Sequence, residues 1–170
     1  MPFVGFAEAY VLSALRSARV PLQRIRPAIE RLADEIGLEH VLASRRLYTD
    51  GVEVLYDYAV GDEDPEPDLV VVRTQQKQFS KLVKAYLQRI TYAKDGWASS
   101  ITLPVYQRTE VFVDPDIGFG QPLVRHGGAR VEDLIDRFQA GDTVLELAED
   151  FGVPPEEVED VIRVATRVAA

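Results

Sequence analysis

The sequence predicts a mainly α-helical protein with a minor β component, the mainly α (α+β) class. Apolar residues recur at i, i+3 and i+4 spacing through six segments of the 170-residue chain, which is typical of amphipathic helices. The β-branched runs are short and are bounded by glycine and proline. Gly141 and Gly152 divide residues 131–170 into three helical lengths, and glycine is a common helix terminator.

The N-terminal part predicts a helix–helix–hairpin unit. Residues 6–18 and 22–36 have helical spacing, and we expect Pro27 to kink the second helix or delay its start. Alternating residues over 47–56 flank Asp50-Gly51, a dipeptide that favours a two-residue hairpin turn. The predicted order is therefore helix, helix and wing.

The acidic, proline-bearing segment 61–68 is the best candidate for a linker. Residues 75–90 predict an amphipathic helix with its cations outside the apolar face, and 101–106 and 110–113 have strand character. The pattern predicts three parts: 1–60, a helical unit with a β-hairpin; 69–107, a linking helix with short strands; and 108–170, a helical C-terminal domain.

The C-terminal part predicts a trihelical unit with helix-turn-helix-like spacing. A loop rich in glycine and proline over 113–122 leads to a short strand at 123–125. Thr143 and Glu146 have the spacing of a capping box at a helix start. The predicted helices are 131–139, 144–151 and 155–168.

The net charge of −9 is unevenly distributed along the chain. Residues 50–68 carry eight acidic and no basic residues, and residues 131–170 carry eleven acidic and three basic residues. The last helix opens with Glu156 and Glu157, whose carboxylates would repel DNA phosphates. We therefore interpret the C-terminal helices as a packing unit rather than as a DNA-reading one.

Arginines gather in the N-terminal helix–helix–wing segment instead. Guanidinium groups suit contacts to phosphate and to guanine, although the same residues could form a solvated helix face. The candidate DNA-binding residues are Arg16, Arg19, Arg24, Arg26, Arg45 and Arg46.

Composition excludes several chemistries. The chain has no cysteine and only two histidines, so disulfides, thiol nucleophiles and cysteine-based metal sites are excluded. We expect no catalytic residue, metal or cofactor. An enzyme using His126 with Asp114 or Asp116 is the weaker alternative, because Asp-Pro-Asp in a glycine-rich loop is typical of a turn. No apolar run approaches the ~20 residues of a membrane span, and no signal peptide opens the chain, so we expect a cytoplasmic protein.

A motif series over residues 113–165 resembles a bacterial domain of unknown function. It comprises an Asp114-Pro-Asp loop, Gly120 shortly before Pro122, an arginine-glycine turn from Arg125, a helix ending in Ala140-Gly141, and an acidic two-helix unit. One departure is Ala129, between Gly128 and Arg130, where the domain pattern has threonine. The domain occurs in antitoxins whose partners are PIN-type ribonucleases.

The N-terminal part resembles the segment that follows a MerR-like helix-turn-helix in longer proteins. The similar stretches are Phe3-Val-Gly-Phe-Ala-Glu-Ala-Tyr10, Val20-Pro-Leu-Gln-Arg-Ile-Arg-Pro-Ala28 and Tyr48-Thr-Asp-Gly51. Together the two parts resemble a VapB-type antitoxin of mycobacteria or actinobacteria. Met1 stands where the MerR-like unit of those relatives should already have ended, so we expect a truncated form of that region or a shorter natural start.

The resemblance implies an antitoxin that neutralises a PIN-type ribonuclease and binds operator DNA as a homodimer. A cation of the antitoxin could occupy the carboxylate site of the nuclease. The candidate toxin-binding residues are Lys77, Lys81, Lys84, Arg89, Arg163 and Arg167. The alternative is a DNA-binding transcriptional regulator without a toxin partner.

The glycine-rich loop is the candidate dimer interface, because glycines let two backbones approach closely and short strands can pair between protomers. The same glycines could simply form tight turns. The candidate interface residues are Phe119, Gly120, Pro122, Val124 and Arg125.

Overall fold

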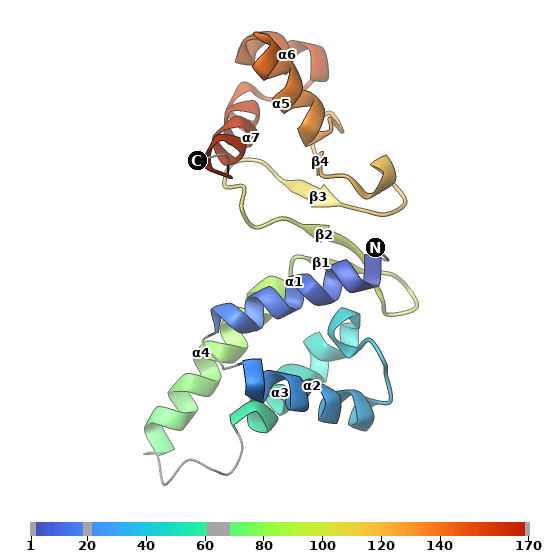
Figure 1. The fold of residues 1–170 in the computed structure, drawn as a ribbon, viewed down its shortest axis with the longest axis vertical. Helices are drawn as coiled ribbons and strands as arrows, with labels where there is room; N and C mark the ends of the chain where they lie inside the picture. Colours follow the sequence, from blue (N-terminus) through green and yellow to red (C-terminus); the bar gives the residue numbers. More distant parts are fainter. Residues whose placement is uncertain (1–2, 19–21, 61–68, 169–170) are drawn as a thin grey trace. The chain divides into compact units, whose positions relative to one another are not determined.

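The computed structural model describes residues 3–18, 22–60 and 69–168 (Figure 1). The chain divides into two compact units, Met1–Ser99 and Ser100–Ala170. Helices make up most of the described elements and accompany one small antiparallel sheet, so the predicted mainly α (α+β) class is confirmed. The three-part division at 1–60, 69–107 and 108–170 stays a prediction, and the linker candidate 61–68 lies outside the described residues.

In its described residues the first unit contains four α-helices: α1, Phe3–Ser17; α2, Leu22–Ile36; α3, Val52–Val60; and α4, Leu69–Leu87. α1 buries Ala7, Val11 and Ala14, a 3–4-residue spacing that places them on one face. This face packs against α4 and against the 3₁₀ turn η1, Val41–Ala43. α2 continues through Pro27 and packs along α3.

The predicted hairpin at 47–56 is wrong. Leu47–Gly51 forms a π-helical turn, η2, that continues directly into α3. Gly51 does not have a positive φ angle; a Cβ atom there would lie 3.2 Å from Leu47 Cδ1 and 3.4 Å from Leu32 Cδ2. The glycine therefore allows close packing against α2 instead of forming a type I′ turn. The predicted wing at 47–56 is therefore absent from the described residues.

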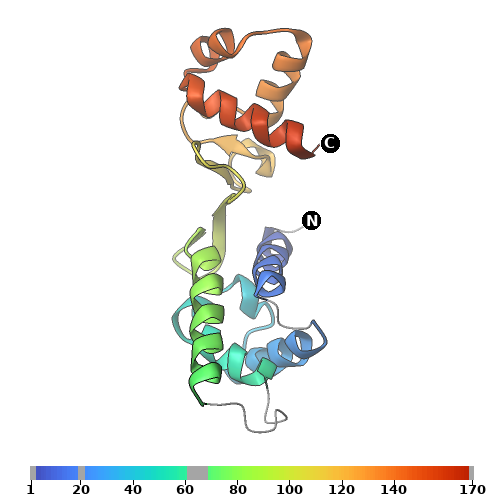
Figure 2. The same ribbon diagram turned by 90° about the vertical axis from the view of Figure 1, so that its left-hand side faces the viewer.

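α4 begins earlier and ends earlier than the predicted helix at 75–90. It buries Phe79, Val83 and Leu87 at i, i+4 and i+8, and Figure 2 shows it running beside α1. The Phe79 ring centroid lies 5.1 Å from that of Tyr56 on α3. This apolar face leaves the lysines of α4 on the outer side.

The sheet has the strand order β1-β2-β3-β4. The strands are β1, Ile90–Tyr92; β2, Ala98–Thr102; β3, Val111–Val113; and β4, Leu123–Val124. β2 pairs antiparallel with β3, with Ile101 opposite Val113, and β3 pairs antiparallel with β4, with Val111 opposite Val124. The predicted strand 101–106 thus ends at Thr102, just before Pro104, which has no N–H for a strand ladder.

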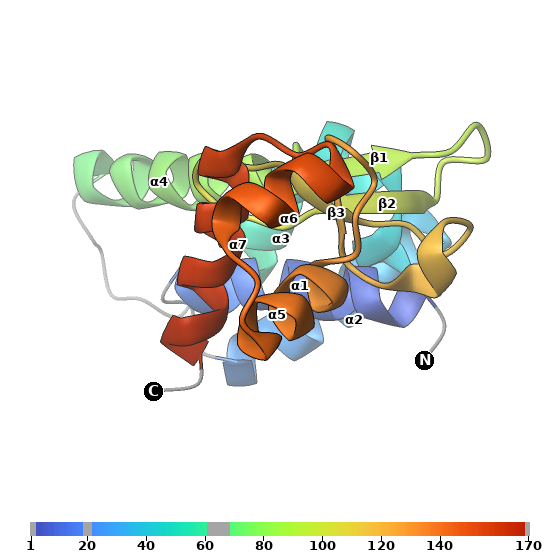
Figure 3. The same ribbon diagram turned by 90° about the horizontal axis from the view of Figure 1, so that it is seen from above.

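Three helices complete the second unit: α5, Val131–Ala140; α6, Val144–Phe151; and α7, Pro155–Val168. These helices agree with the predicted ones to within one residue. Thr143 and Glu146 form the predicted capping box. The helices gather around a core that includes Leu134, Leu147 and Val161 (Figure 3). No helix in the described part of the chain is long and apolar enough to cross a membrane.

Candidate functional site

The predicted DNA-binding arginines lie on the surface of the first unit. Arg16 lies in the last turn of α1, and Arg24 and Arg26 lie on α2. Arg45 and Arg46 precede η2, and Arg46 Nη1 donates a hydrogen bond to the Ile36 carbonyl at 3.2 Å. These five side chains are exposed, and Arg19 lies outside the described residues. Their exposure is compatible with phosphate contacts and equally with a solvated helix face.

A pocket of about 370 Å³ adjoins Arg45. Its lining includes Arg45, Tyr48, Gln88 and Tyr92. Burial raises the pKa of Tyr92 to about 12, Tyr48 adds to the rise, and Arg45 lowers it. The phenol is therefore neutral at physiological pH, and its hydroxyl oxygen has no hydrogen-bond partner among the described residues.

The predicted toxin-binding cations of α4 lie outside its apolar face. Lys77 and Lys81 are exposed, and Arg89 follows the helix on the surface. Lys84 forms an ion pair with Glu53 at 3.5 Å; both side chains are well exposed, so the pair contributes no more than about 1 kcal/mol. These cations are thus accessible to a negatively charged partner.

The arginines of the second unit are mostly engaged by carboxylates of the same unit. Arg125 pairs with Glu110 at 2.9 Å, and its guanidinium carbon lies 3.9 Å from the centroid of the Phe112 ring. Further pairs join Arg130 to Asp133, Arg137 to Asp142 and Asp150, and Arg163 to Asp160. The predicted toxin contact Arg163 is thus held within its own unit, whereas Arg167 is exposed in the last turn of α7.

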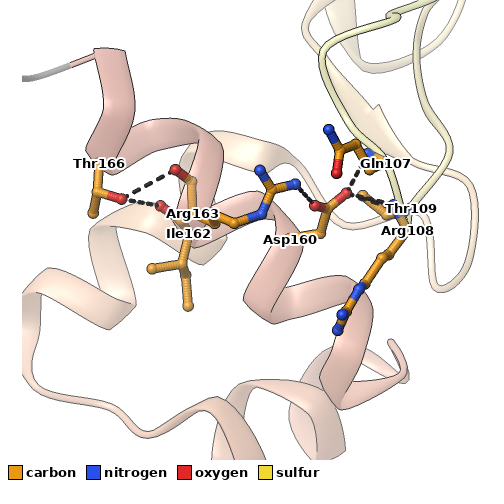
Figure 4. A network of polar contacts seen from close by, with 7 residues as sticks. All are labelled: Gln107, Arg108, Thr109, Asp160, Ile162, Arg163 and Thr166. Carbon is orange, nitrogen blue, oxygen red and sulfur yellow. Dashed lines mark hydrogen bonds and ion pairs between the residues drawn. The ribbon is translucent and has the colours of Figure 1, made fainter.

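Asp160 is the centre of a buried network that joins α7 to the segment after β2 (Figure 4). Its Oδ2 accepts backbone N–H bonds from Gln107 at 2.7 Å, Arg108 at 2.8 Å and Thr109 at 3.2 Å, and its Oδ1 accepts a bond from Arg163. Burial acts to raise the pKa of Asp160, but these hydrogen bonds outweigh it and hold the pKa below its usual value. The carboxylate therefore stabilises the second unit.

Glu157 lies one turn earlier on α7 and completes this network. It accepts a 2.8 Å hydrogen bond from the Thr109 hydroxyl, and His126 Nδ1 lies 2.5 Å from its other carboxylate oxygen. This role was not predicted from the sequence, although Glu157, Asp160 and Val161 share one stripe of α7 by their spacing. His126 thus contacts Glu157, and the described residues contain no group of three or more potential metal ligands.

The loop between β3 and β4 presents Phe119 to solvent. Its side chain is 99% exposed, and its φ angle of 58° is the one positive value among the described non-glycine residues. Of the other predicted interface residues, Val124 is fully buried in β4, while Gly120 and Pro122 are half-buried. The Val124 side chain packs in the core, so a partner could contact only the remaining residues of this set.

The acidic residues of the same loop form a turn. Asp114 Oδ1 accepts a 2.9 Å hydrogen bond from the Asp116 N–H, and the Ile117 N–H bonds to the Asp114 carbonyl at 3.3 Å. An aspartate that bonds to the backbone two residues ahead is typical of an Asx turn. This geometry accounts for Asp-Pro-Asp without a catalytic role.

Comparison with known families defines the class of protein. Residues 1–29 match a family described as "Putative DNA-binding HTH domain", and residues 111–165 match "Protein of unknown function (DUF433)". The first match covers α1 and the beginning of α2, and the second covers β3 to α7. The chain thus combines a region similar to a helix-turn-helix family with a region similar to the bacterial domain whose motifs the sequence contains.

A curated protein and a solved structure, both from Mycobacterium tuberculosis, match nearly the whole chain. It is 44% identical to "Putative antitoxin VapB45" of strain ATCC 25618 / H37Rv, over 95% of this chain and 70% of the relative. The crystal structure of Rv2018 has a TM-score of 0.80 and 40% identity, over 95% of this chain and 78% of that one. The chain belongs to the VapB-type antitoxin family, as the resemblance in its sequence predicted.

Proposed function

We propose that this protein is the antitoxin of a type II toxin–antitoxin pair, which neutralises a PIN-type ribonuclease in the cytoplasm without catalysing a reaction itself. The observation that carries the proposal is the 44% identity, over 95% of the chain, to the protein named "Putative antitoxin VapB45". The helix-turn-helix match at residues 1–29 supports a second role in binding operator DNA.

The toxin partner is tested by co-purification. A tagged full chain, expressed with its neighbouring genes, is expected to retain a small ribonuclease in stoichiometric amount. Recovery of the chain without a nuclease would favour the alternative, a DNA-binding transcriptional regulator with no toxin partner. That alternative requires only the DNA-binding role, which the helix-turn-helix match supports.

The cations of α4 are the predicted inhibitory elements. We expect Lys81→Ala/Lys84→Ala/Arg89→Ala to require at least about tenfold more protein for half-inhibition of the nuclease, since tenfold corresponds to only about 1.4 kcal/mol and lost charge pairs at interfaces often cost more. The measurement is RNA cleavage at varied antitoxin concentration. Lys94→Ala, in the turn between β1 and β2, is the matched control; equal inhibition by the triple variant would exclude α4 from this role.

Operator binding is assigned to the first unit because the second unit has a net charge of −8 over residues 100–170 and would repel phosphate. We expect Arg16→Gln/Arg26→Gln to weaken binding to DNA from upstream of the gene. If both arginines contact phosphate, the slope of log K against log salt should fall by roughly 2. Fluorescence anisotropy at several salt concentrations measures this slope, and Arg108→Gln in the second unit is the control that should leave it unchanged.

A further inference from the structure

The exposed large apolar side chains of the described residues all lie in the second unit. They are Val105, Ile117, Phe119, Phe138 and Leu145, and Phe119 is the most exposed of them. An apolar side chain held fully in water gains nothing from folding. Aromatic residues are enriched where proteins contact one another, so a fully exposed one in a defined backbone conformation is a candidate contact for another molecule.

The loop holds Phe119 outward in a fixed, unfavourable conformation. Gly118, Phe119 and Gly120 have successive φ angles of 58°, 58° and 73°, and the left-handed region costs a non-glycine residue about 1–2 kcal/mol. The Gly120 N–H bonds to the Ile117 carbonyl at 3.2 Å, and Gly118 packs so closely that a Cβ there would lie 3.1 Å from the Leu123 side chain. The hydrogen bond and the close packing thus fix the turn, and its strained backbone directs the Phe119 ring into solvent.

An apolar recess begins directly after this turn. It has a volume of about 380 Å³ and is lined mainly by apolar atoms. Pro122, Val131 and Ile135 contribute to its lining together with the carboxylates of Glu132 and Asp136. Gln121 is the first lining residue along the chain, and only Gly120 separates it from Phe119, so the turn leads directly into a recess with an apolar centre and an acidic rim.

Charge decides which partner this surface fits. The second unit has a net charge of −8, and most of its arginines are already paired with carboxylates of the unit. A second copy would bring the same charge to the contact and would be repelled. A ribonuclease binds a polyanion, so the surface that receives RNA must carry cations. Such a surface is complementary to the acidic rim.

We propose that the Ile117–Phe119 turn and the adjacent recess dock onto the RNA-binding surface of the partner ribonuclease, with Phe119 as the apolar anchor and Glu132 and Asp136 facing its cations. This inference rests on the proposed antitoxin function. In this proposal the second unit supplies most of the affinity for the nuclease, whereas the cations of α4 act on the nuclease active site.

The test compares Phe119→Asn with Leu145→Asn in the full chain, by titration calorimetry against a catalytically inactive form of the nuclease. Asparagine tolerates the left-handed conformation, so Phe119→Asn should leave the thermal unfolding midpoint unchanged or slightly raised. We expect it to weaken nuclease binding by at least about 30-fold, as the loss of an interface anchor does. Leu145, 69% exposed on α6, is the matched apolar control and should change binding by less than about twofold.

Two further measurements complete the test. Glu132→Gln/Asp136→Asn should reduce the salt dependence of nuclease binding, and a single-stranded RNA oligonucleotide should compete with the wild-type chain. Nuclease binding by Phe119→Asn that equals wild type would overturn the docking surface while leaving the antitoxin function intact. If the wild-type chain does not bind the nuclease, both the docking surface and the antitoxin function are overturned. A wild-type dimer that becomes a monomer in Phe119→Asn, by light scattering, would assign the turn to the predicted homodimer instead and also overturn the proposal.

Discussion

Replacement of Asp160 by alanine is expected to lower the unfolding free energy of the second unit by about 3–5 kcal/mol, as the loss of one partner in a buried charge network does. The substitution leaves three backbone N–H groups and Arg163 without the carboxylate that they share. A unit of this size has a total stability of about 4–10 kcal/mol, at roughly 0.05–0.15 kcal/mol per residue. The loss would therefore unfold a measurable fraction of the protein at 37 °C.

Urea unfolding followed by circular dichroism measures this loss. Glu159→Ala is the matched control, because Glu159 is the exposed acidic neighbour of Asp160 on α7, and it should change stability by less than about 0.5 kcal/mol. Equal stability of the two variants would show that the network contributes little.

The same network predicts that the unfolding free energy of the second unit depends on pH. The folded pKa of Asp160 lies below its usual value, which is about 3.9 in the unfolded chain. The stability that its charge contributes is therefore present above about pH 4 and is lost as the pH falls through the folded pKa. The difference in unfolding free energy between wild type and Asp160→Asn should thus be largest at neutral pH and shrink in acid.

Gly127→Ala is the second substitution with a large expected effect. A Cβ atom at this position would lie 2.2 Å from the Phe151 carbonyl oxygen and 3.0 Å from Val153 Cγ2. The φ angle of 72° adds the left-handed penalty. Overpacking costs typically 1–3 kcal/mol and the left-handed conformation about 1–2 kcal/mol, so we expect a loss of about 2–5 kcal/mol.

Gly128→Ala separates these two contributions. Gly128 has a similar φ angle of 66°, but a Cβ there would have no atom within 4 Å. Gly128→Ala should therefore lower the unfolding free energy only by the cost of the left-handed conformation, about 1–2 kcal/mol. Calorimetric unfolding of the two variants measures the difference, and equal losses would show that the turn moves away from Phe151 at little cost.

The sequence predicts the C-terminal helices well because their boundaries depend on local signals. The capping box of Thr143 and the left-handed glycines Gly141 and Gly152 act within one helical turn. The hairpin failed because the role of Gly51 depends on Leu32, a residue of another helix. Val52, Leu55 and Tyr56 fit a helical stripe, while the same stretch also contains the alternation of a strand, and only the packing decides between them.

The candidate site shows the same division between local and distant determinants. Exposure of the arginines and of the α4 lysines follows from helical periodicity. The pairing of Arg163 with Asp160 is an i, i+3 contact within α7 that the spacing allows. The hydrogen bonds that Asp160 accepts from residues 107–109 could not be predicted, because their donors lie more than fifty residues earlier in the chain. Phe119 was a predicted interface residue, but its full exposure depends on three successive left-handed residues that sequence patterns do not indicate.

The distance along the chain between Gln107 and Asp160 has a consequence for synthesis. The three N–H groups of residues 107–109 emerge from the ribosome long before their acceptor, which is 53 residues further on for Gln107. At about 5–20 residues per second, this interval is about 3–10 s. During that time water must hydrate these donors, while the helices of the first unit are already available to pack. The nascent chain therefore acquires its N-terminal fold first and closes its C-terminal fold only when α7 is made.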